Sequence, residues 1–330
     1  MGKLASIIIV TYNHRKYLES CIDSLLNQDY PYEIILVDNC SQDRTSQFIK
    51  EKYPGITFIQ SEKNIGYGAG NNLGTKHAKG EYLVFLNPDT IVDNGWLREL
   101  IKPFTSNKKM ITTPKILTYD GSVINTCGTI NHFTGLTFTR GYTANPSYYQ
   151  KQEYVSGFSG CCFAIKKEDF ISLRGFDENF FCYNEDSELS WRALKKGYKI
   201  LFVPSSTLRH DYTLKVIPEK IYHLEKGRYI ILRKYFSWKD VVLLLPSLIM
   251  AEFLTFGYAA KCGRRALRFK IKAIKDGFAF QIKVDKNNSI VIFKQLNFKI
   301  PLDQLTYNWL EKAIKVAANY IFKWNLRLLR

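Results

Sequence analysis

SIIIV, residues 6–10, is a mostly β-branched apolar run, and three similar runs follow it within the first hundred residues. They are EIILVD at 33–38, ITFIQ at 56–60 and YLVFL at 82–86. Short and almost continuously apolar runs are typical of strands that are buried on both faces. We therefore expect these four runs to be strands of one parallel sheet that is covered by helices.

The segments between these runs have the periodicity of amphipathic helices. Within residues 14–28 the apolar residues recur on one helix face, and Asn13 stands where an N-cap is expected. Ser41 takes the same position before a second helix at 42–52. Further along the chain, a helix is expected at about 185–196 and a strand at 198–203. The alternation predicts an α/β fold with a mostly parallel sheet flanked by helices.

Polar residues follow the carboxyl ends of all four predicted strands. In open parallel sheets, ligands bind at this edge. The sequence therefore predicts a ligand site there. Its candidate residues are Thr11, Tyr12 and Asn13 after the first strand, Asp38 and Asn39 after the second, Asn64 after the third, and Asn87 and Asp89 after the fourth.

LVFLNPDT, residues 83–90, ends in an isolated carboxylate. Asp89, with the amide of Asn87 two residues before it, can hold a hard divalent cation that takes its other ligands from water and a diphosphate. The alternative is an ordinary turn, because Asn-Pro and Asp are common turn formers. The position of Asp89 at the ligand edge favours the cation site.

The glycine-rich stretch at 64–74 suggests a dinucleotide-binding loop, but its spacing excludes one. Asn71 occupies the position at which the G-x-G-x-x-G fingerprint requires glycine, and the stretch follows the third strand instead of the first. Gly66 lets the backbone approach a ligand closely, and Asn64, Asn71 and Asn72 offer amides to a base or ribose. The alternative is a tight turn that leads into a helix.

A second set of charged residues lies at the start of the helix expected near 185–196. Glu185, Asp186 and Glu188 are three carboxylates with several aromatic neighbours in sequence. Solvated charges that complement the helix dipole are one interpretation. A carboxylate in a partly apolar pocket instead has a raised pKa and can act as a base near neutral pH.

The basic charge of the chain is concentrated in its last third. Residues 211–330 carry 23 Lys and Arg against 9 Asp and Glu, a net of +14, whereas residues 1–210 carry 24 against 21, a net of +3. This asymmetry indicates an anionic partner, either a nucleic acid or a membrane surface. The basic part contains no recognisable nucleic-acid-binding motif. We therefore expect no nucleic-acid partner.

An apolar stretch at 241–260 precedes a cluster of basic residues that begins at Lys261. The stretch is long enough to span a bilayer, but Pro246 and Glu252 argue against a simple span. Apolar and basic faces together favour a helix that lies on an anionic membrane surface; a span and a buried or oligomer-forming helix are the alternatives.

We expect helices near 217–236, 238–260 and 303–330, a β-like segment at 289–300, and domains at 1–213 and 214–330.

Seven stretches of the chain follow one another in the order and spacing of family 2 glycosyltransferases. The chain resembles this family, and within it the rhamnosyltransferase branch, over about residues 4–212. No single stretch is specific, but seven in order are. They are SIIIVTYN, ILVDNCSQDRT, NIGYGAGNNLG, FLNPDT, VSGFSGCCFAIKKEDF, GFDENFFCYNEDSELSWR and VPSSTLRH.

The resemblance implies a GT-A fold, which is Rossmann-like, a nucleotide-diphosphate-sugar donor and a divalent metal, Mg²⁺ or Mn²⁺. A dTDP- or UDP-linked donor fits the rhamnosyltransferase branch. The resemblance also assigns particular residues to the donor and to the metal. Thr11, Tyr12 and Asn13 line the nucleotide pocket, Asp38 accepts a hydrogen bond from the pyrimidine, Asn64 and the turn from Gly66 to Asn72 close over the nucleoside, and Asn87 and Asp89 correspond to the DXD motif, with Asp89 on the metal.

By the same resemblance, Asp186 is the base that deprotonates an acceptor hydroxyl, and His210 lies near the diphosphate or metal. A surface histidine after a strand is the alternative for His210. Two positions depart from the family pattern. Asn87 replaces an aspartate of DXD, so metal affinity is expected to be modest, and Glu188 replaces an aspartate of the ED-x-D-L motif, which leaves its role open.

The expected activity is metal-dependent, inverting transfer of a sugar to a lipid-linked glycan. We expect a cytoplasmic protein that is peripheral on the inner face of the cell membrane, because the N-terminus lacks the pattern of a signal peptide. An oligomer is possible. The alternatives are a nucleotidyltransferase and a non-catalytic protein that binds a membrane or a nucleic acid.

Overall fold

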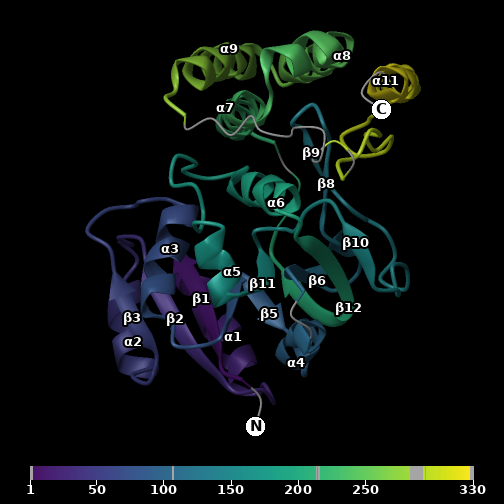
Figure 1. Cartoon of the computed structure of the whole chain (residues 1–330). Helices are drawn as coiled ribbons and strands as arrows, with labels where there is room; N and C mark the ends of the chain where they lie inside the picture. The colour runs from purple at the N-terminus through teal and green to yellow at the C-terminus, as the bar shows by residue number, and fades with distance from the viewer. Residues whose placement is uncertain are drawn as a thin grey trace. The chain divides into compact units, whose positions relative to one another are not determined.

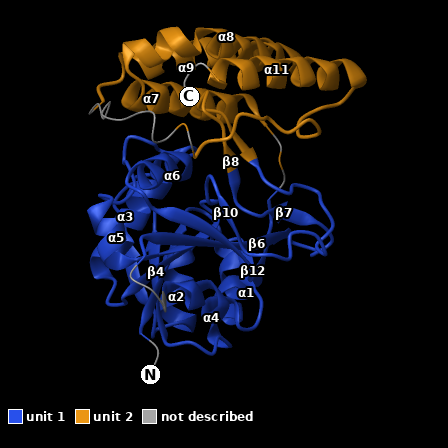
Figure 2. Ribbon diagram, turned by 45° about the vertical axis from the view of Figure 1, so that its right-hand side comes forward, with its two compact units in different colours: residues 1–129, 139–213 blue, residues 130–138, 214–330 orange. Residues whose placement is uncertain are grey.

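The computed structural model describes residues 3–105, 108–212, 214, 216–282, 293 and 295–327 (Figure 1). The chain divides into two compact units, which Figure 2 shows in different colours. The first unit consists of residues 1–129 and 139–213, and the second of residues 130–138 and 214–330. The assignment of separate functions to residues 1–213 and 214–330 stays a prediction.

The first unit is built on a sheet whose N-terminal half has the predicted alternation of strands and helices. Strands β1 to β4 are all parallel, in the order β3-β2-β1-β4. The prediction of a parallel sheet flanked by helices is confirmed for this half. The elements are β1 (Ala5–Thr11), α1 (Arg15–Leu26), β2 (Tyr32–Asp38), α2 (Thr45–Lys52), β3 (Thr57–Gln60), α3 (Tyr67–His77) and β4 (Tyr82–Leu86).

The other half of the sheet is mixed. Strand β11 (Cys162–Lys166) runs antiparallel between β4 and β6 (Met110–Thr118), and β12 (Lys199–His210) is parallel to β6. Three short antiparallel strands, β5 (Thr90–Val92), β7 (Ile124–Thr126) and β10 (Glu153–Val155), complete it. The helices of this half are α4 (Trp96–Ile101), the 3₁₀ helix η1 (Lys102–Thr105), α5 (Lys167–Ser172) and α6 (Glu185–Lys195).

Strand β12 is longer than the predicted strand at 198–203 because it continues through an irregularity. Its pairing with β6 shifts register between Val203 and Thr207. Pro204, which has no N–H to donate to a ladder, lies inside this interval. Beyond it the strand resumes and pairs with β5, with His210 opposite Thr90. This continuation carries His210 to the end of β4.

Neither predicted helix cap is correct. Helix α1 begins at Arg15 after His14, and α2 begins at Thr45 after Arg44, and neither preceding residue makes a side-chain cap bond. The backbone N–H of Asn13 instead donates to Ser41 Oγ (2.8 Å), and the side-chain Oδ1 of Asn13 accepts from the backbone N–H of Gln42 (2.8 Å). Because these bonds are available between the loops, the two residues join the ends of β1 and β2.

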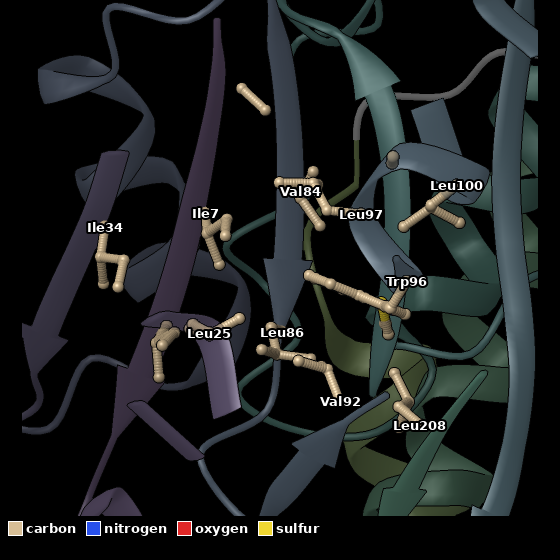
Figure 3. Close-up of a cluster of buried hydrophobic side chains, with 14 of the residues drawn as sticks. Ile7, Leu25, Ile34, Val84, Leu86, Val92, Trp96, Leu97, Leu100 and Leu208 are labelled. Carbon is tan, nitrogen blue, oxygen red and sulfur yellow. The ribbon is translucent and has the colours of Figure 1, made fainter. Parts of the chain in front are cut away.

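The core on one face of the sheet is made by strand residues, α1 and α4. Figure 3 shows Ile7, Val84 and Leu208 from the sheet, with Leu25 of α1 and Trp96 of α4 around them. All five side chains are essentially inaccessible to solvent. Complete burial of an apolar side chain of this size contributes about 1.5–3 kcal/mol. This packing fixes the positions of the strand ends.

Helix α3 lies directly on β1 because two of its three glycines, Gly70 and Gly74, face that strand. A Cβ atom on Gly70 would lie 2.7 Å from Val10 Cγ1, and one on Gly74 would lie 2.6 Å from Ile8 Cγ2. Both distances are far below van der Waals contact. The glycine-rich stretch at 64–74 is therefore explained in part by helix packing.

The second unit is mainly helical. It contains α7 (Pro218–Tyr235), α8 (Trp238–Lys261), α9 (Arg264–Ala279) and α11 (Trp309–Arg327). Helix α9 packs against α7 and α8, and α11 packs against α8 (Figure 1). Strands β8 (Thr129–Asn131) and β9 (Thr137–Thr139) form a separate two-stranded sheet. Residues 289–292 and 294 of the expected β-like segment lie outside the described residues, and its described residues form no strand.

A buried network of charges holds three helices of the second unit together. Arg228 of α7 pairs with Glu225 (2.9 Å) and with Glu252 of α8, and Lys270 of α9 pairs with the same two carboxylates. Lys270 is completely buried. Because every charge has an opposite partner at close range, the cost of burial is offset.

Candidate functional site

The ends of β1 and β2 present buried polar atoms at the edge of the sheet. Thr11 lies opposite Asp38 in the strand register, and the Asn39 N–H donates to Thr11 O (2.8 Å). Asp38 Oδ1 accepts from the Ser41 N–H (3.0 Å). Within the described part of the chain, Asp38 Oδ2 and Thr11 Oγ1 are buried without a hydrogen-bond partner. Since unpaired buried acceptors are costly, these atoms indicate a ligand that donates to them.

Tyr12 and Asn13 follow Thr11 at this edge. Both side chains are exposed, with 42% of Tyr12 accessible to solvent. Tyr12 is therefore accessible to a ligand ring. Asn13 holds the loop after β1 against the loop after β2 by the two hydrogen bonds described above. Its predicted contact with the nucleotide stays a prediction.

The loop before α3 is fixed on both sides by hydrogen bonds. Asn64 Oδ1 accepts from the Gly66 N–H (2.9 Å), and Asn39 Nδ2 donates to Gly66 O (3.0 Å). Gly66 has φ = 86°, and a Cβ atom there would lie 2.3 Å from the Phe181 carbonyl oxygen. The same carbonyl accepts from the Tyr67 N–H (3.0 Å). The close approach that Gly66 permits is thus to the backbone of the loop before α6.

Asn71 and Asn72 have their amides engaged within the protein. Asn71 Nδ2 donates to Tyr67 O inside α3 (3.0 Å). Asn72 Nδ2 donates to Phe176 O and to Glu178 Oε1 (both 3.0 Å), while its Oδ1 accepts from the Phe176 N–H (2.9 Å). Asn72 therefore holds the loop that leads to α6. The predicted contacts of these amides with the nucleoside stay predictions.

Asp89 and His210 lie next to each other because β12 pairs with β5. His210 Nε2 lies 3.3 Å from Asp89 Oδ1, and the imidazole ring stacks on Tyr212 with centroids 5.4 Å apart. Burial opposes ionisation of Asp89, but the neighbouring His210 and His14 outweigh it and hold the pKa of Asp89 below its ordinary value. Asp89 is therefore a carboxylate at neutral pH.

This pair fits two ligands of one divalent cation. Adjacent ligands of an octahedral Mg²⁺ ion lie about 3 Å apart, since its bonds are about 2.0–2.1 Å long. Asp89 Oδ1 is buried, and among the described residues it accepts no well-aligned hydrogen bond. Within the described ranges, no group of three or more His, Cys, Asp or Glu side chains is arranged to hold a metal. A cation here would need further ligands from outside these two side chains.

Asp186 lies in the first turn of α6 with both carboxylate oxygens hydrogen-bonded. Gly160 N–H donates to Asp186 Oδ2 (2.9 Å), and Ser187 N–H donates to Oδ1 (2.7 Å). Burial raises the pKa of Asp186, and the backbone N–H donors only partly oppose this. Burial, together with the charge of Asp186, also raises the pKa of Glu185. A carboxylate with a raised pKa is a stronger base than an exposed one.

The turn at residues 159–161 connects the parts of this site. Gly160 donates its N–H to Asp186, and its carbonyl accepts from the Tyr67 hydroxyl at the start of α3. The next carbonyl, that of Cys161, accepts from the Asn87 N–H (2.9 Å). Asp186, the loop before α3 and the turn after β4 are therefore held by the backbone groups of two consecutive residues, Gly160 and Cys161.

Glu188 has a packing role. Its side chain is fully buried and pairs with Arg192 (2.6 Å), which also donates to the Leu173 carbonyl. The pair links α6 to the end of α5.

Sequence reasoning did not identify four residues that organise the site, namely His14, Tyr67, Gly160 and Tyr212. Tyr212 stacks on His210, and burial raises its pKa, with Tyr183, Tyr142 and Asp186 near enough to add to the shift. Gly160 and Tyr67 lie within quoted stretches, but nothing in their type marks them. Only the tertiary contacts reveal these four positions.

Comparisons with known proteins agree with this geometry. The profile "Glycosyl transferase family 2" matches residues 6–174, slightly more than half of the chain, and "N-terminal domain of galactosyltransferase" matches residues 140–216. The N-acetylglucosaminyl-diphospho-decaprenol L-rhamnosyltransferase of Mycobacterium tuberculosis is 27% identical over 307 residues, which cover 83% of this chain and 99% of that protein.

Two further similarities cover smaller shares of the other proteins. O-antigen biosynthesis protein RfbC of Myxococcus xanthus is 27% identical over 246 residues, which are 68% of this chain but 19% of RfbC. The crystal structure of GalNAc-T7 with UDP, GalNAc and Mn²⁺ has a TM-score of 0.61 at 19% identity and covers 82% of this chain and 54% of that chain. At this identity the likeness shows the fold, which is GT-A-like as expected.

Proposed function

Because this chain belongs to glycosyl transferase family 2, we propose that it moves a sugar, with rhamnose the first choice, from a dTDP- or UDP-linked donor to a lipid-linked glycan. The hydroxyl acceptor follows from the base at Asp186. The lipid link is supported by the decaprenol in the name of the mycobacterial relative. The choice of a UDP-linked donor and of Mn²⁺ is supported by the structure of GalNAc-T7, which contains UDP and Mn²⁺.

The observation that carries this proposal is the turn at residues 159–161. Asp186, the proposed base, is bound by the Gly160 N–H, and the turn that bears Asp89 is bound by the Cys161 carbonyl. Transfer requires a base near the acceptor hydroxyl and a cation at the leaving diphosphate, on opposite sides of one anomeric carbon. The backbone of two adjacent residues, Gly160 and Cys161, holds both groups and so supports such an arrangement.

The nucleoside is proposed to bind at the ends of β1 and β2. The unpaired Asp38 Oδ2 accepts the N–H of a pyrimidine ring, and Thr11 Oγ1 supplies a second polar contact. Tyr12 is exposed beside them and can cover the ring or the ribose. The bond from Asn39 Nδ2 to the Gly66 carbonyl keeps the loop before α3 close to this pocket, and Asn64 braces that loop by accepting the Gly66 N–H.

In the proposed reaction Asp186 accepts the proton of the acceptor hydroxyl as its oxygen attacks the anomeric carbon. The new C–O bond forms while the bond to the diphosphate oxygen breaks, so the electron pair leaves with the nucleoside diphosphate. One displacement of this kind inverts the anomeric configuration. Asp89 and His210 would hold Mg²⁺ or Mn²⁺, which when bound offsets the negative charge of the leaving diphosphate.

We also propose that the protein lies on the inner face of the cytoplasmic membrane. Helix α8 is long and apolar enough to cross a membrane by length and composition, and 17% of its most apolar window is buried. The adjoining α9 exposes Arg264, Arg265 and Arg268. Exposed apolar and cationic side chains on neighbouring helices favour a surface position on anionic lipid.

Replacement of the proposed base tests the reaction. Asp186→Asn should lower turnover by about 10²–10⁴-fold, while calorimetry should show unchanged binding of the donor nucleotide. Asp120→Asn, at an exposed turn, is the matched control and should keep full turnover. The product also decides the reaction class: release of nucleoside diphosphate supports sugar transfer, whereas release of pyrophosphate would indicate a nucleotidyltransferase. Undiminished turnover by Asp186→Asn would rule out the assigned base.

A further inference from the structure

The second unit contains an apolar groove between α7 and α8. Its volume is about 600 Å³, within the range of small-molecule sites. One wall is a stripe along α8 that includes Val241, Leu245, Leu248 and Ile249. The opposite wall includes Tyr229 of α7 and Phe236, which directly follows α7, and Phe278 of α9 also lines the groove. The groove is therefore lined almost throughout by hydrocarbon and aromatic rings.

The groove is continuous with an exposed apolar surface. Val241, Leu245 and Ile249 line the groove and are also 40–60% accessible to solvent. Tyr229 and Phe236 on the opposite wall are buried. A slender apolar ligand can therefore pass from the surface of α8 to contact side chains that a flat membrane surface does not reach.

The charged residues of the groove favour an anionic ligand. Glu252 lies in the wall, but its carboxylate is already paired with Arg228 and Lys270. Arg233, also in the wall, donates to the carbonyls of Gly277 (2.6 Å) and Phe280 (2.8 Å), which are neutral. The wall thus has one cation whose charge no carboxylate offsets among the described contacts.

We propose that this groove binds the isoprenoid chain of the lipid-linked acceptor, with Arg233 facing its anionic diphosphate. The inference rests on the proposed function, which supplies an acceptor on a lipid carrier. A groove of this volume suits a single flexible chain, whereas a stable protein interface buries about 800 Å² on each partner. The site would select the carrier lipid, in addition to the glycan that the lipid bears.

Geranylgeranyl diphosphate is a suitable probe because it joins an isoprenoid chain to a diphosphate. Its affinity for the full-length protein should be measured by calorimetry in the presence of saturating UDP, which keeps the diphosphate out of the proposed donor site. We expect the probe to bind at least about tenfold more tightly than inorganic diphosphate. Displacement of the probe by UDP, or equal binding of the two diphosphates, would overturn the proposal.

Variants of α8 locate the probe. Leu245→Trp and Ile249→Trp fill the groove and should each weaken probe binding at least about tenfold. Leu243→Trp is the matched control, because Leu243 is on the same helix and is similarly exposed (45% against 48% for Leu245) but does not line the groove. It should bind the probe as the wild type does. Equal loss in the groove and control variants would indicate adsorption to the helix surface and refute the groove.

Circular dichroism should confirm that each variant is folded, and two groove variants guard against the loss of one of them. The outcome is independent of the proposed reaction. Probe binding needs no turnover, and the Asp186→Asn experiment needs no lipid binding. If probe binding fails while nucleoside diphosphate is still released from the donor, only the groove assignment falls.

Discussion

Gly66→Ala tests the connection between the loop before α3 and the loop before α6. Gly66 has φ = 86° and ψ = 173°, a backbone region that is essentially restricted to glycine. The methyl group of alanine would lie 2.3 Å from the Phe181 carbonyl oxygen. Because the same oxygen accepts the Tyr67 N–H, the loop cannot move away without losing that hydrogen bond.

The expected loss of stability follows from two costs. An alanine in this backbone region costs about 1–3 kcal/mol. Displacement of the Phe181 carbonyl removes one hydrogen bond, which contributes about 1 kcal/mol. We therefore expect Gly66→Ala to lower the free energy of unfolding of the first unit by about 2–4 kcal/mol.

Two other glycines separate these costs. Gly263 has φ = 99° and ψ = 176° and also precedes a helix, and Gly197, in the same unit as Gly66, has φ = 81°. A Cβ atom at either position would meet no atom within 4 Å. Gly263→Ala and Gly197→Ala should therefore incur the backbone cost alone.

Urea unfolding gives the required comparison. Trp96 and Trp191 are buried in the first unit, so their fluorescence should report its unfolding, while circular dichroism follows the helices of both units. Gly66→Ala should lose at least about 1 kcal/mol more than either control, and its affinity for the donor nucleotide should also fall. A loss no greater than that of the controls would show that contact with Phe181 does not restrain the loop.

Three further predictions concern charge. A chelator should abolish transfer, and Mg²⁺ or Mn²⁺ should restore it; transfer that persists in chelator would remove the metal from the mechanism. Burial and the charge of Asp186 raise the pKa of Glu185 from 4.5 to about 8, so the wild type should lose stability as pH rises between these two values, and Glu185→Gln should gain urea resistance relative to the wild type over the same range. Burial lowers the pKa of His132 from 6.5 to about 3, so stability should fall as pH falls between these two values, and His132→Phe should flatten this loss in urea unfolding followed by circular dichroism.

The strands and helices of the N-terminal half could be predicted because each has a local signal. β1, β2 and β4 are apolar runs, and α1 has one apolar face; both patterns are set by residues close together in sequence. The helix caps could not be predicted, because Asn13 and Ser41 form a hydrogen bond with each other across two loops. Among the described contacts, neither side chain accepts from a backbone N–H in the first turn of the helix that follows it. Local propensity was outweighed there by a tertiary contact.

The site shows the same limit more clearly. Asp38 and Asp89 could be located because strand ends are visible in the sequence, but the place of His210 depends on the irregular register between β12 and β6. The role of Gly160 is likewise invisible, since it acts through its peptide N–H and carbonyl, which every residue but proline possesses. Gly160 is distinguished only by its position between Asp186 and Tyr67.

The substitution of Asn87 for the first DXD aspartate has a physical consequence in this arrangement. Asn87 still fixes the turn after β4, because its N–H donates to Cys161 O and its carbonyl accepts from Thr90 Oγ1 (2.7 Å). These two backbone hydrogen bonds fix the turn without any help from the side chain at position 87. Because the Asn87 side chain is neutral, Asp89 is the one carboxylate of this motif. In the proposed metal site, a divalent cation held by the Asp89 carboxylate and the His210 imidazole would keep a net positive charge. We propose that this charge would be available to the diphosphate of the donor, so weaker binding of the free cation would go with stronger dependence of the cation on the bound donor.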